Sequence, residues 1–430
     1  MKAISLFSGM GGDSLGMKRA GFEVIAHSEI NPTFQKTHKL NFPECELIGT
    51  GNISQTTDDE FLKYKGKVQL IFAGFPCQSF SNAGNKKPND PRNTLFKEFL
   101  RATKIIKPNY IIGENVKGLL SRKTVGGENY IDLIKEAFEG EGYVISYKML
   151  TASKYGLPQK RERLFIVGIK NTSPAGTGQT FVFPKEINDT TPASPPVPAE
   201  PPVSPLLKVS PPHLNQELLT KPEACPCLQH PAGTGSLGLS RKRSFERNDP
   251  NTGIAPFLNF NLEGAVRIYK EDFDMTSIRQ ECVLTDMENM EEPSSCHPYL
   301  KLLAKRKNVL YEGKTHESTL SFEKRNSPIH GEIVNIYKPA KTIISTYARQ
   351  PRLFVPLKNG KGFFLRCFLP DELKQIQGFP SDYKIEGNVS EQIIQIGNAV
   401  PPILVTKIVE NLSRHGSHLA SKEMIQDLQR

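Results

Sequence analysis

The chain has 430 residues, with 55 Lys and Arg against 45 Asp and Glu, a formal net charge of +10. This length allows two or three domains, and the basic balance favours an anionic partner, of which nucleic acid is the commonest. The seven cysteines are odd in number and scattered, which argues against a disulfide framework. No apolar run predicts a membrane span. We therefore expect an intracellular protein, in the nucleoid or nucleus according to host, with no membrane partner.

The first part of the chain, 1–170, alternates short apolar runs with amphipathic stretches. The apolar runs predict strands at 3–7, 23–27, 68–73, 109–113, 144–150 and 163–169. Helical periodicity predicts helices at 13–21, 94–106 and 130–142. This alternation indicates an α/β fold with a mostly parallel sheet covered by helices on both faces.

The composition changes after this part. Proline is dense over 184–212, and because it lacks an amide donor the segment is expected to be an extended linker or surface excursion, with a spacer favoured over a ligand for a partner. The basic cluster RKRSFER (241–247) fits a phosphate contact, a nuclear address or a solvated loop. CPCLQH (225–230) lacks a second ligand pair and is a weak zinc signal, so no metal is expected.

Regular structure is expected to return near residue 341. The run KTIISTY (341–347) predicts a strand, and 371–379 and 401–412 predict helices. The second helix has proline at its start, where a missing amide is harmless. A polar tail is expected over 413–430.

A glycine-rich turn, LFSGMGGDSLG (6–16), lies between the first predicted strand and helix. Glycines let a ligand approach the backbone closely, and a helix N-terminus offers unpaired amides. Glu29 follows the second predicted strand, where a carboxylate can bind ribose hydroxyls in nucleotide-binding α/β folds.

Three further groups fall at strand ends of the same predicted sheet. Cys77, in GFPCQSFS, follows the strand at 68–73, Glu114 follows the next, and QKRER (159–163) precedes the last. A thiol in a polar turn suits a nucleophile, although Cys77 could also pack, Glu114 could cap a helix, and the QKRER charges could be solvated. Their convergence on one edge favours a reactive site.

The motifs FSGMGG, GFPCQSFS, ENV, QKRER, QGFP and GNAVPP occur in this order. With them the chain resembles the C5 cytosine methyltransferases of DNA over residues 1–170 and about 341–412. The resemblance implies a class I S-adenosylmethionine-dependent methyltransferase fold, a Rossmann-like mostly parallel sheet with a smaller target-recognition domain. The implied parts are a catalytic and cofactor-binding domain (1–170), a target-recognition region (171–340, including 184–212), a return to the catalytic domain (341–412) and the tail.

The activity implied by the resemblance is that of a DNA (cytosine-5-)-methyltransferase, EC class 2.1.1. Cys77 would add to C6 of a flipped cytosine, Glu114 would bind N3 and the exocyclic amine, and Arg161 would bind O2, where negative charge develops. The implied catalytic residues are Cys77, Glu114, Arg161, Arg163, Asn115 and Gln159.

The resemblance also implies a set of residues around S-adenosyl-L-methionine. The turn would hold its methionine end, Glu29 its ribose, and Asn52 and Ile53 its adenine. Asn52 stands where the family usually has Asp. The implied cofactor residues are Phe7, Ser8, Gly9, Met10, Gly11, Gly12, Glu29, Ile30, Asn52, Ile53, Pro76, Leu95, Asn398, Ala399 and Val400.

Double-stranded DNA is the partner implied by the resemblance, bound by a monomer, with a cognate restriction enzyme as a further candidate partner. Two alternatives remain. A related branch methylates cytosine in tRNA with the same catalytic set, but usually carries Pro-Pro-Cys-Gln, where this chain has Phe-Pro-Cys-Gln. A silent DNA-binding module would be expected to have lost Cys77, Glu114 or the turn glycines, and all are present.

Overall fold

The computed structural model describes residues 1–76, 95–124, 126–171, 179–187, 266–268, 300–311, 314–322, 331–334, 338–349, 353–359 and 362–427. Contacts divide the chain into two units, and all described residues belong to the unit formed by Met1–Asp189 and Phe245–Arg430. The predicted boundaries at residues 170, 340 and 412 stay predictions.

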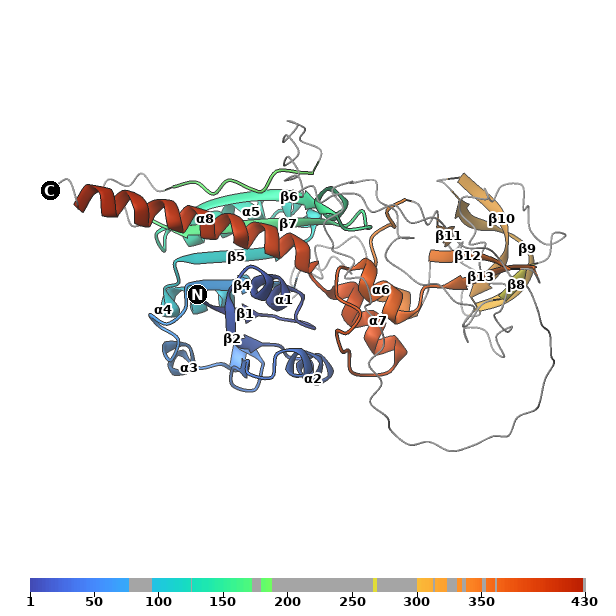
Figure 1. Ribbon diagram of the computed structural model, residues 1–430, viewed down its shortest axis with the longest axis horizontal. Helices are drawn as coiled ribbons and strands as arrows, with labels where there is room; N and C mark the ends of the chain where they lie inside the picture. Colours follow the sequence, from blue (N-terminus) through green and yellow to red (C-terminus); the bar gives the residue numbers. More distant parts are fainter. Residues whose placement is uncertain are drawn as a thin grey trace, which may run out of the picture. The chain divides into compact units, whose positions relative to one another are not determined.

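The first sheet has seven strands in the order β3-β2-β1-β4-β5-β7-β6 (Figure 1). The first five run parallel, and β7 is antiparallel to both of its neighbours. The strands are β1 (Lys2–Leu6), β2 (Glu23–Ser28), β3 (Glu46–Leu47), β4 (Leu70–Ala73), β5 (Tyr110–Asn115), β6 (Tyr143–Thr151) and β7 (Glu162–Lys170). All six predicted strands are confirmed, and only the two-residue β3 was not predicted. The strand order reverses between β1 and β4, and their carboxyl ends define the crevice where such sheets bind ligands.

Alternate residues of the buried strands point to opposite faces, each with its own core. In β4, Leu70 and Phe72 pack with α1 and α8, whereas Ile71 and Ala73 pack with α3, α4 and α5. The helices that cover the sheet are α1 (Gly12–Arg19), α3 (Asp58–Leu62), α4 (Phe96–Ile106), α5 (Tyr130–Glu139) and α8 (Pro402–Asp427). The predicted α/β architecture, with helices on both faces, is therefore confirmed.

Local sequence explains where several helices begin. Asn31 caps α2 by accepting a hydrogen bond from the Thr33 amide (2.9 Å), and Pro32 occupies the first turn. Asn388 and Glu391 form a capping box at the start of α7. The remaining helices are α2 (Pro32–Asn41), α6 (Pro370–Ile376) and α7 (Val389–Asn398), with short 3-10 turns η1 (Ile53–Gln55), η3 (Lys117–Ser121), η4 (Ala152–Tyr155) and η8 (Ser345–Ala348).

The long helix α8 packs directly on α1. A side chain at Gly16 would collide with Val405 and with the Pro402 carbonyl oxygen, so the glycine permits the close approach. Val389–Arg414, spanning α7 and the first half of α8, is long and apolar enough to cross a membrane by composition alone, which the sequence patterns had not indicated. Since 67% of its 18-residue apolar window is buried, this segment contributes to the protein core. The helix also continues to Asp427, into the predicted polar tail.

The second sheet has six strands in the order β10-β9-β11-β12-β13-β8. They are β8 (Val266–Ile268), β9 (Leu300–Tyr311), β10 (Lys314–Phe322), β11 (Gly331–Ile333), β12 (Leu353–Asn359) and β13 (Gly362–Cys367). Strands β9 and β10 form a long antiparallel pair. The sequence patterns had not predicted these strands.

The prediction of a strand at 341–347 is wrong. Its backbone groups are taken by buried side chains rather than by a neighbouring strand: the Ile343 amide donates to Gln159 Oε1 (2.9 Å) and its carbonyl oxygen accepts from Arg161 (2.7 Å). Residues 345–348 form the turn η8 instead.

The start of the proline-rich segment contacts η4, beside the first sheet. Tyr155 donates to the Pro184 carbonyl oxygen (3.1 Å), and Lys154 pairs with Glu186 (2.8 Å). Residues 184–187 of the predicted linker are therefore packed against η4, and the rest of it lies outside the described residues, as do 225–230 and 241–247.

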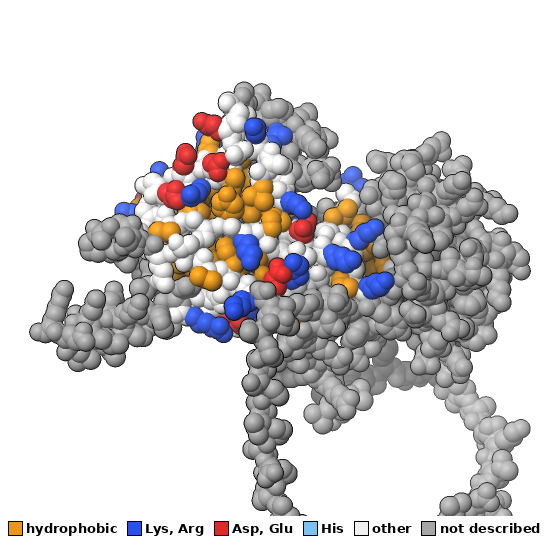
Figure 2. All heavy atoms as spheres, turned by 90° about the horizontal axis from the view of Figure 1, so that it is seen from above, with side chains coloured by type: hydrophobic (Ala, Val, Ile, Leu, Met, Phe, Trp, Pro, Cys, Tyr) orange, Lys and Arg blue, Asp and Glu red, His pale blue; other side chains and the backbone are white. Residues whose placement is uncertain are grey.

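The net positive charge does not form a continuous patch on the face seen in Figure 2. There, Lys and Arg side chains stand singly or in small groups, with Asp and Glu side chains among them and hydrophobic side chains between. This face of the described residues therefore does not locate the expected anionic partner.

Candidate active site

The glycine turn after β1 has an unusual backbone. Phe7 (φ 57°), Gly9 (φ 55°) and Gly11 (φ 90°) all adopt left-handed conformations. Apart from the chain neighbours of Gly9, no heavy atom of the described residues lies within 4 Å of the position that a Cβ would take there, whereas at Gly11 it would meet Phe42, Tyr383 and His38. A Cβ at Gly12 would collide with the Val400 carbonyl oxygen. Gly9 thus borders open space, while Gly11 and Gly12 let protein segments pack closely.

Glu29, at the end of β2, contacts this turn. Its two carboxylate oxygens accept hydrogen bonds from the amides of Gly9 (2.8 Å) and Asn31 (2.9 Å). Burial raises the pKa of Glu29, and the backbone hydrogen bonds oppose that rise. The neighbouring Ile30 side chain is 67% exposed, so this end of the turn has both a carboxylate and an apolar surface.

The remaining predicted cofactor residues differ in their exposure. Ser8, Met10, Gly11, Gly12, Ile53 and Ala399 are buried, Asn52, Pro76, Leu95 and Val400 are partly buried, and Asn398 is exposed. Asn52 caps η1 by accepting from the Ser54 amide (3.2 Å). Met10 lies under the turn, and its carbonyl oxygen accepts from Tyr383.

Gly74, just beyond β4, marks where three separate chain segments meet. A Cβ placed there would lie 3.7 Å from the Phe7 carbonyl oxygen, 3.7 Å from Val400 Cγ2 and 3.8 Å from Glu114 Oε2. The turn, the GNAVPP motif and the ENV motif therefore converge at the carboxyl edge of the sheet. Gly74 was not among the predicted site residues, although it begins GFPCQSFS. Cys77 and the rest of 77–94 lie outside the described residues.

Glu114 and Arg163 form an ion pair at this edge. Arg163 Nε lies 2.9 Å from Glu114 Oε1, and the two side chains are 14% and 11% exposed. Strand β7 is antiparallel to β5, which places its first residues beside the last residues of β5. Burial raises the pKa of Glu114, and the positive charges of Arg163 and Arg161 oppose the rise.

Arg161 and Gln159 are fully buried, and their side chains form hydrogen bonds to distant parts of the chain. The Arg161 guanidinium donates to the carbonyl oxygens of Ile343 (2.7 Å), Gly397 (3.1 Å) and Ala399 (2.9 Å). Gln159 donates to the Gln377 side chain (2.6 Å), which in turn donates to the Ala399 carbonyl oxygen (2.6 Å). These two residues thus join QKRER, QGFP and GNAVPP.

Asn115 supports the segment that leads to Cys77. Its side-chain amide donates to the Phe75 carbonyl oxygen (3.3 Å), and its side-chain oxygen accepts from the Val116 amide (2.9 Å). The Phe75 ring is buried and lies 6.4 Å from the ring of Phe99. The end of β5 therefore fixes the backbone immediately before the predicted nucleophile.

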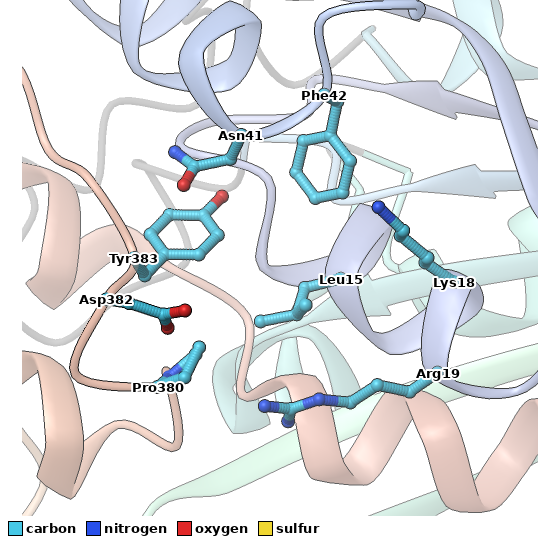
Figure 3. A pocket seen from close by; sticks show the side chains of 8 residues that line it. All are labelled: Leu15, Lys18, Arg19, Asn41, Phe42, Pro380, Asp382 and Tyr383. Carbon is cyan, nitrogen blue, oxygen red and sulfur yellow. The ribbon is translucent and has the colours of Figure 1, made fainter. Parts of the chain in front are cut away.

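A pocket of about 280 Å³ lies between α1, the end of α2 and residues 380–383 (Figure 3). Figure 3 shows Lys18 and Arg19 extending from α1 and Asp382 and Tyr383 opposite them. Its lining contains none of the predicted catalytic or cofactor residues. It is therefore not the site that the sequence motifs predict. Among the described residues no group of His, Cys, Asp and Glu could hold a metal ion.

Asp13 is a buried carboxyl beside the turn. It accepts a hydrogen bond from the Ser5 hydroxyl through Oδ2, and its Oδ1 has no partner. Burial raises the pKa of Asp13 to about 7. Between about pH 4 and pH 7 the unfolded chain is therefore ionised at this position while the folded chain keeps the proton, so this group's contribution to stability falls as pH rises through that window.

Asp13→Asn is expected to remove this pH dependence. The variant should match the wild type near pH 4 and become more stable by pH 8, by up to ~4 kcal/mol, since each pKa unit corresponds to about 1.4 kcal/mol. Urea unfolding at pH 5, 6, 7 and 8 measures the difference, with exposed Asp59→Asn as the control. A difference in unfolding free energy that stays constant with pH would contradict a neutral buried Asp13.

A mostly parallel α/β sheet, with a glycine turn after β1, a carboxylate after β2 and a crevice at the carboxyl edge, defines a class I S-adenosylmethionine-dependent methyltransferase fold. The chain belongs to the family of C-5 cytosine-specific DNA methylases, whose profile matches residues 1–414. The predicted family and enzyme class, a DNA (cytosine-5-)-methyltransferase, are therefore confirmed.

Type II methyltransferases are among the curated relatives. M.DdeI of Desulfomicrobium norvegicum is 28% identical over 461 residues, covering 99% of this chain and 94% of that protein. M.FnuDI of Fusobacterium nucleatum is 42% identical over 190 residues, covering 44% of this chain and 52% of that protein.

Two solved structures share the fold. A mutant of Spodoptera frugiperda DNMT2 has a TM-score of 0.53 at 17% identity, covering 96% of this chain and 99% of that one. The S. pombe Dnmt2 methyltransferase has a TM-score of 0.52 at 13% identity, covering 95% and 97%. At these identities the likeness concerns the fold alone.

Proposed function

We propose that this enzyme methylates C5 of a cytosine rotated out of duplex DNA, at a short specific sequence, through a transient bond between Cys77 and C6 of the base. The observation that carries the proposal is the convergence at Gly74. There the turn, the GNAVPP motif and Glu114 meet within 4 Å of one point, next to the segment that leads to Cys77. A base must leave the stack to reach groups at such an edge.

The residues around the turn fit S-adenosylmethionine. Open space beside Gly9 permits close approach, and Glu29 presents a carboxylate to ribose hydroxyls while already bound to the turn. Exposed Ile30 and partly buried Asn52 supply the surface that we assign to adenine. When bound, S-adenosylmethionine supplies an electrophilic methyl group, which the electron-rich C5 of the base accepts.

Glu114 and Arg163 are suited to hold the cytosine ring. A carboxyl group whose pKa is raised keeps a proton more readily, and can share it with N3 as the ring accepts an electron pair. The sequence resemblance gave the O2 contact to Arg161. We assign it to Arg163, because Arg161 is fully buried and its Nη1 and Nη2 atoms already donate to carbonyl oxygens.

The proposed addition begins at Cys77. Its thiolate donates an electron pair to C6, and the ring electrons move toward N3, which takes the Glu114 proton. After methyl transfer, solvent water takes the C5 proton and the C6–S bond breaks. The thiolate and the aromatic ring are then restored, and the N3 proton returns to Glu114. Arg163 stabilises the negative charge that develops on O2 during addition.

We further propose that the enzyme acts on DNA as a monomer in the nucleoid or nucleus, with residues 171–340 reading the target sequence. The names of the Type II relatives support a restriction-modification setting with a cognate restriction enzyme. Lys and Arg side chains of that region would contact phosphate, and other side chains would contact base edges.

The experiment is expression in a bacterial host that lacks cytosine methylation, followed by base-resolution mapping of 5-methylcytosine in DNA and in tRNA from the same cells. The expected result is methylation at one short recurring DNA sequence, absent from the host without the gene. Methylation confined to tRNA would favour the related tRNA branch. No methylation of either, by folded protein that binds S-adenosylmethionine, would favour the silent module.

A further inference from the structure

Three consecutive residues at the end of β2 contact three consecutive residues of the turn. The Phe7 amide donates to Ser28 Oγ (3.4 Å), the Ser8 hydroxyl contacts His27 Nδ1 (3.0 Å), and the Gly9 amide donates to Glu29 Oε2 (2.8 Å). The Ser8 amide also donates to the Ser28 carbonyl oxygen (2.9 Å). We call His27, Ser28 and Glu29 the β2 clamp.

The turn needs such support because its backbone is not one that the chain adopts freely. Phe7 is a left-handed residue that is not glycine, and such conformations persist only where surrounding contacts determine them. Ser8 stands between two left-handed residues. A shift at Ser8 would therefore move the amide of Gly9 and the open surface beside it.

The clamp is anchored from behind by a second imidazole. His27 and His38 are 2% and 0% exposed, and their rings stack at 3.7 Å with an interplanar angle of 12°. His38 Nε2 lies 2.9 Å from the Ser14 hydroxyl, which ties α2 to α1. His38 Nδ1 has no partner, and because an unpaired acceptor costs less than an unpaired donor, the proton belongs on Nε2.

Both rings are neutral at ordinary pH. Burial lowers the pKa of His27 to about 4 and also lowers that of His38 well below its usual range. Neutral rings match their neutral serine partners. The side chains are therefore arranged to hold geometry and not to carry charge.

We propose that His27 is a positioning residue, which acts through Ser8 to hold the cofactor turn in its binding conformation and so sets the affinity for S-adenosylmethionine. This inference rests on the proposed function, which gives the turn its ligand. His27 touches neither the ligand nor the reacting base, so its effect falls on cofactor affinity and not on the chemical step.

The experiment uses the full chain and compares His27→Leu with His27→Asn. Leucine removes the nitrogen that contacts Ser8, whereas asparagine keeps a polar atom at the position of Nδ1. Equilibrium binding of S-adenosylmethionine, the KM for S-adenosylmethionine and kcat are measured with saturating DNA. Thermal unfolding without cofactor reports folding, and Ser146→Ala, on β6, is the hydroxyl-removal control.

For His27→Leu we expect Kd and KM to rise about tenfold, with kcat at saturating cofactor changed less than about threefold. His27→Asn should recover most of the affinity, and Ser146→Ala should not change it. If His27→Leu does not fold, Ser8→Ala removes the same contact from the other side and should raise Kd similarly.

The proposal is overturned if folded His27→Leu or Ser8→Ala binds S-adenosylmethionine like the wild type, or if kcat falls while KM stays constant. It is also overturned if His27→Asn is as weak a binder as His27→Leu, since ring packing alone would then explain the loss. Wild-type protein that binds no S-adenosylmethionine would overturn the proposed function and this inference together.

Discussion

Cys77→Ala is expected to abolish methyl transfer while the protein stays folded and binds S-adenosylmethionine. No other group in GFPCQSFS has comparable nucleophilicity near neutral pH, so without the thiolate C5 is not activated. The fold around this position is held by other residues. Asn115 fixes the Phe75 carbonyl oxygen, and the Phe75 ring is buried in the core.

The described cysteines offer a matched control. Cys45 and Cys367 are both buried, and burial raises the pKa of each thiol to about 12, so neither forms a thiolate at neutral pH. Cys45→Ala should keep kcat within about threefold of the wild type, with a modest loss of stability from the small cavity. This comparison separates loss of a reactive thiol from loss of any cysteine.

Two measurements test the Cys77 prediction. The first is transfer of labelled methyl groups to DNA, with cofactor binding and thermal unfolding measured on the same samples. The second is a covalent trap, using duplex DNA with fluorine at C5 of the target cytosine, because release of Cys77 requires loss of a proton from C5. Wild type and Cys45→Ala should form a denaturant-resistant complex, and Cys77→Ala should form none. Methyl transfer by folded Cys77→Ala would contradict the covalent mechanism.

The carboxyl edge of the sheet could be predicted because its signals are local. Each apolar run ends at a residue that the chain marks with Gly, Pro or a polar group, and parallel strands bring those ends together. Cys77 and Glu114 were placed on one edge for this reason. Arg163 begins its strand and reaches the same edge, 2.9 Å from Glu114, because β7 runs antiparallel to β5, which the apolar runs did not reveal.

The partners of individual side chains could not be predicted, because they depend on contacts distant in sequence. Arg161 and Arg163 are two residues apart, on a short stretch with several charges, and nothing local says which one faces the crevice. Arg161 is buried because residues 343, 397 and 399 present carbonyl oxygens to it. The Ile343 contact also explains why no strand forms at 341–347, since its carbonyl oxygen bonds to Arg161 and not to a neighbouring strand.

The β2 clamp is a similar case. The sequence HSE (27–29) suggested a carboxylate for ribose, but not that its two preceding residues bind the turn. One signal was that FSG (7–9) and HSE (27–29) stand at the ends of adjacent parallel strands, each with polar groups that can bind the other. His38 comes from α2, a helix that the periodicity did not reveal, so the stacked pair could not have been anticipated.

The second large effect is expected from Arg161 and Arg163. Substitution of Arg161 should lower stability, and substitution of Arg163 should lower kcat. Arg161→Met removes the donor to three buried carbonyl oxygens, and each unsatisfied polar group costs about 1–3 kcal/mol, so we expect a loss of roughly 3–5 kcal/mol in the free energy of unfolding. Arg163→Met should cost less stability, because Glu114, whose pKa is already raised by burial, can take up a proton when its partner is removed. It should lower kcat by about 10²–10³-fold by removing the charge proposed to face O2.

A pH signature separates these roles further. Arg163 is the largest influence that opposes the raised pKa of Glu114, so in Arg163→Met that pKa should rise further. If Glu114 acts while protonated, activity falls as pH rises through the pKa of Glu114. In Arg163→Met this fall should therefore occur at a higher pH than in the wild type. Urea unfolding, kcat and the pH–rate profile of both variants are the measurements. If Arg161→Met is stable but has lost turnover, and Arg163→Met is active, the O2 contact must be assigned to Arg161. The opposite pattern means that the two arginines of QKRER have different roles. Arg161 stabilises the fold by joining separate chain segments, and Arg163 acts on the cytosine base.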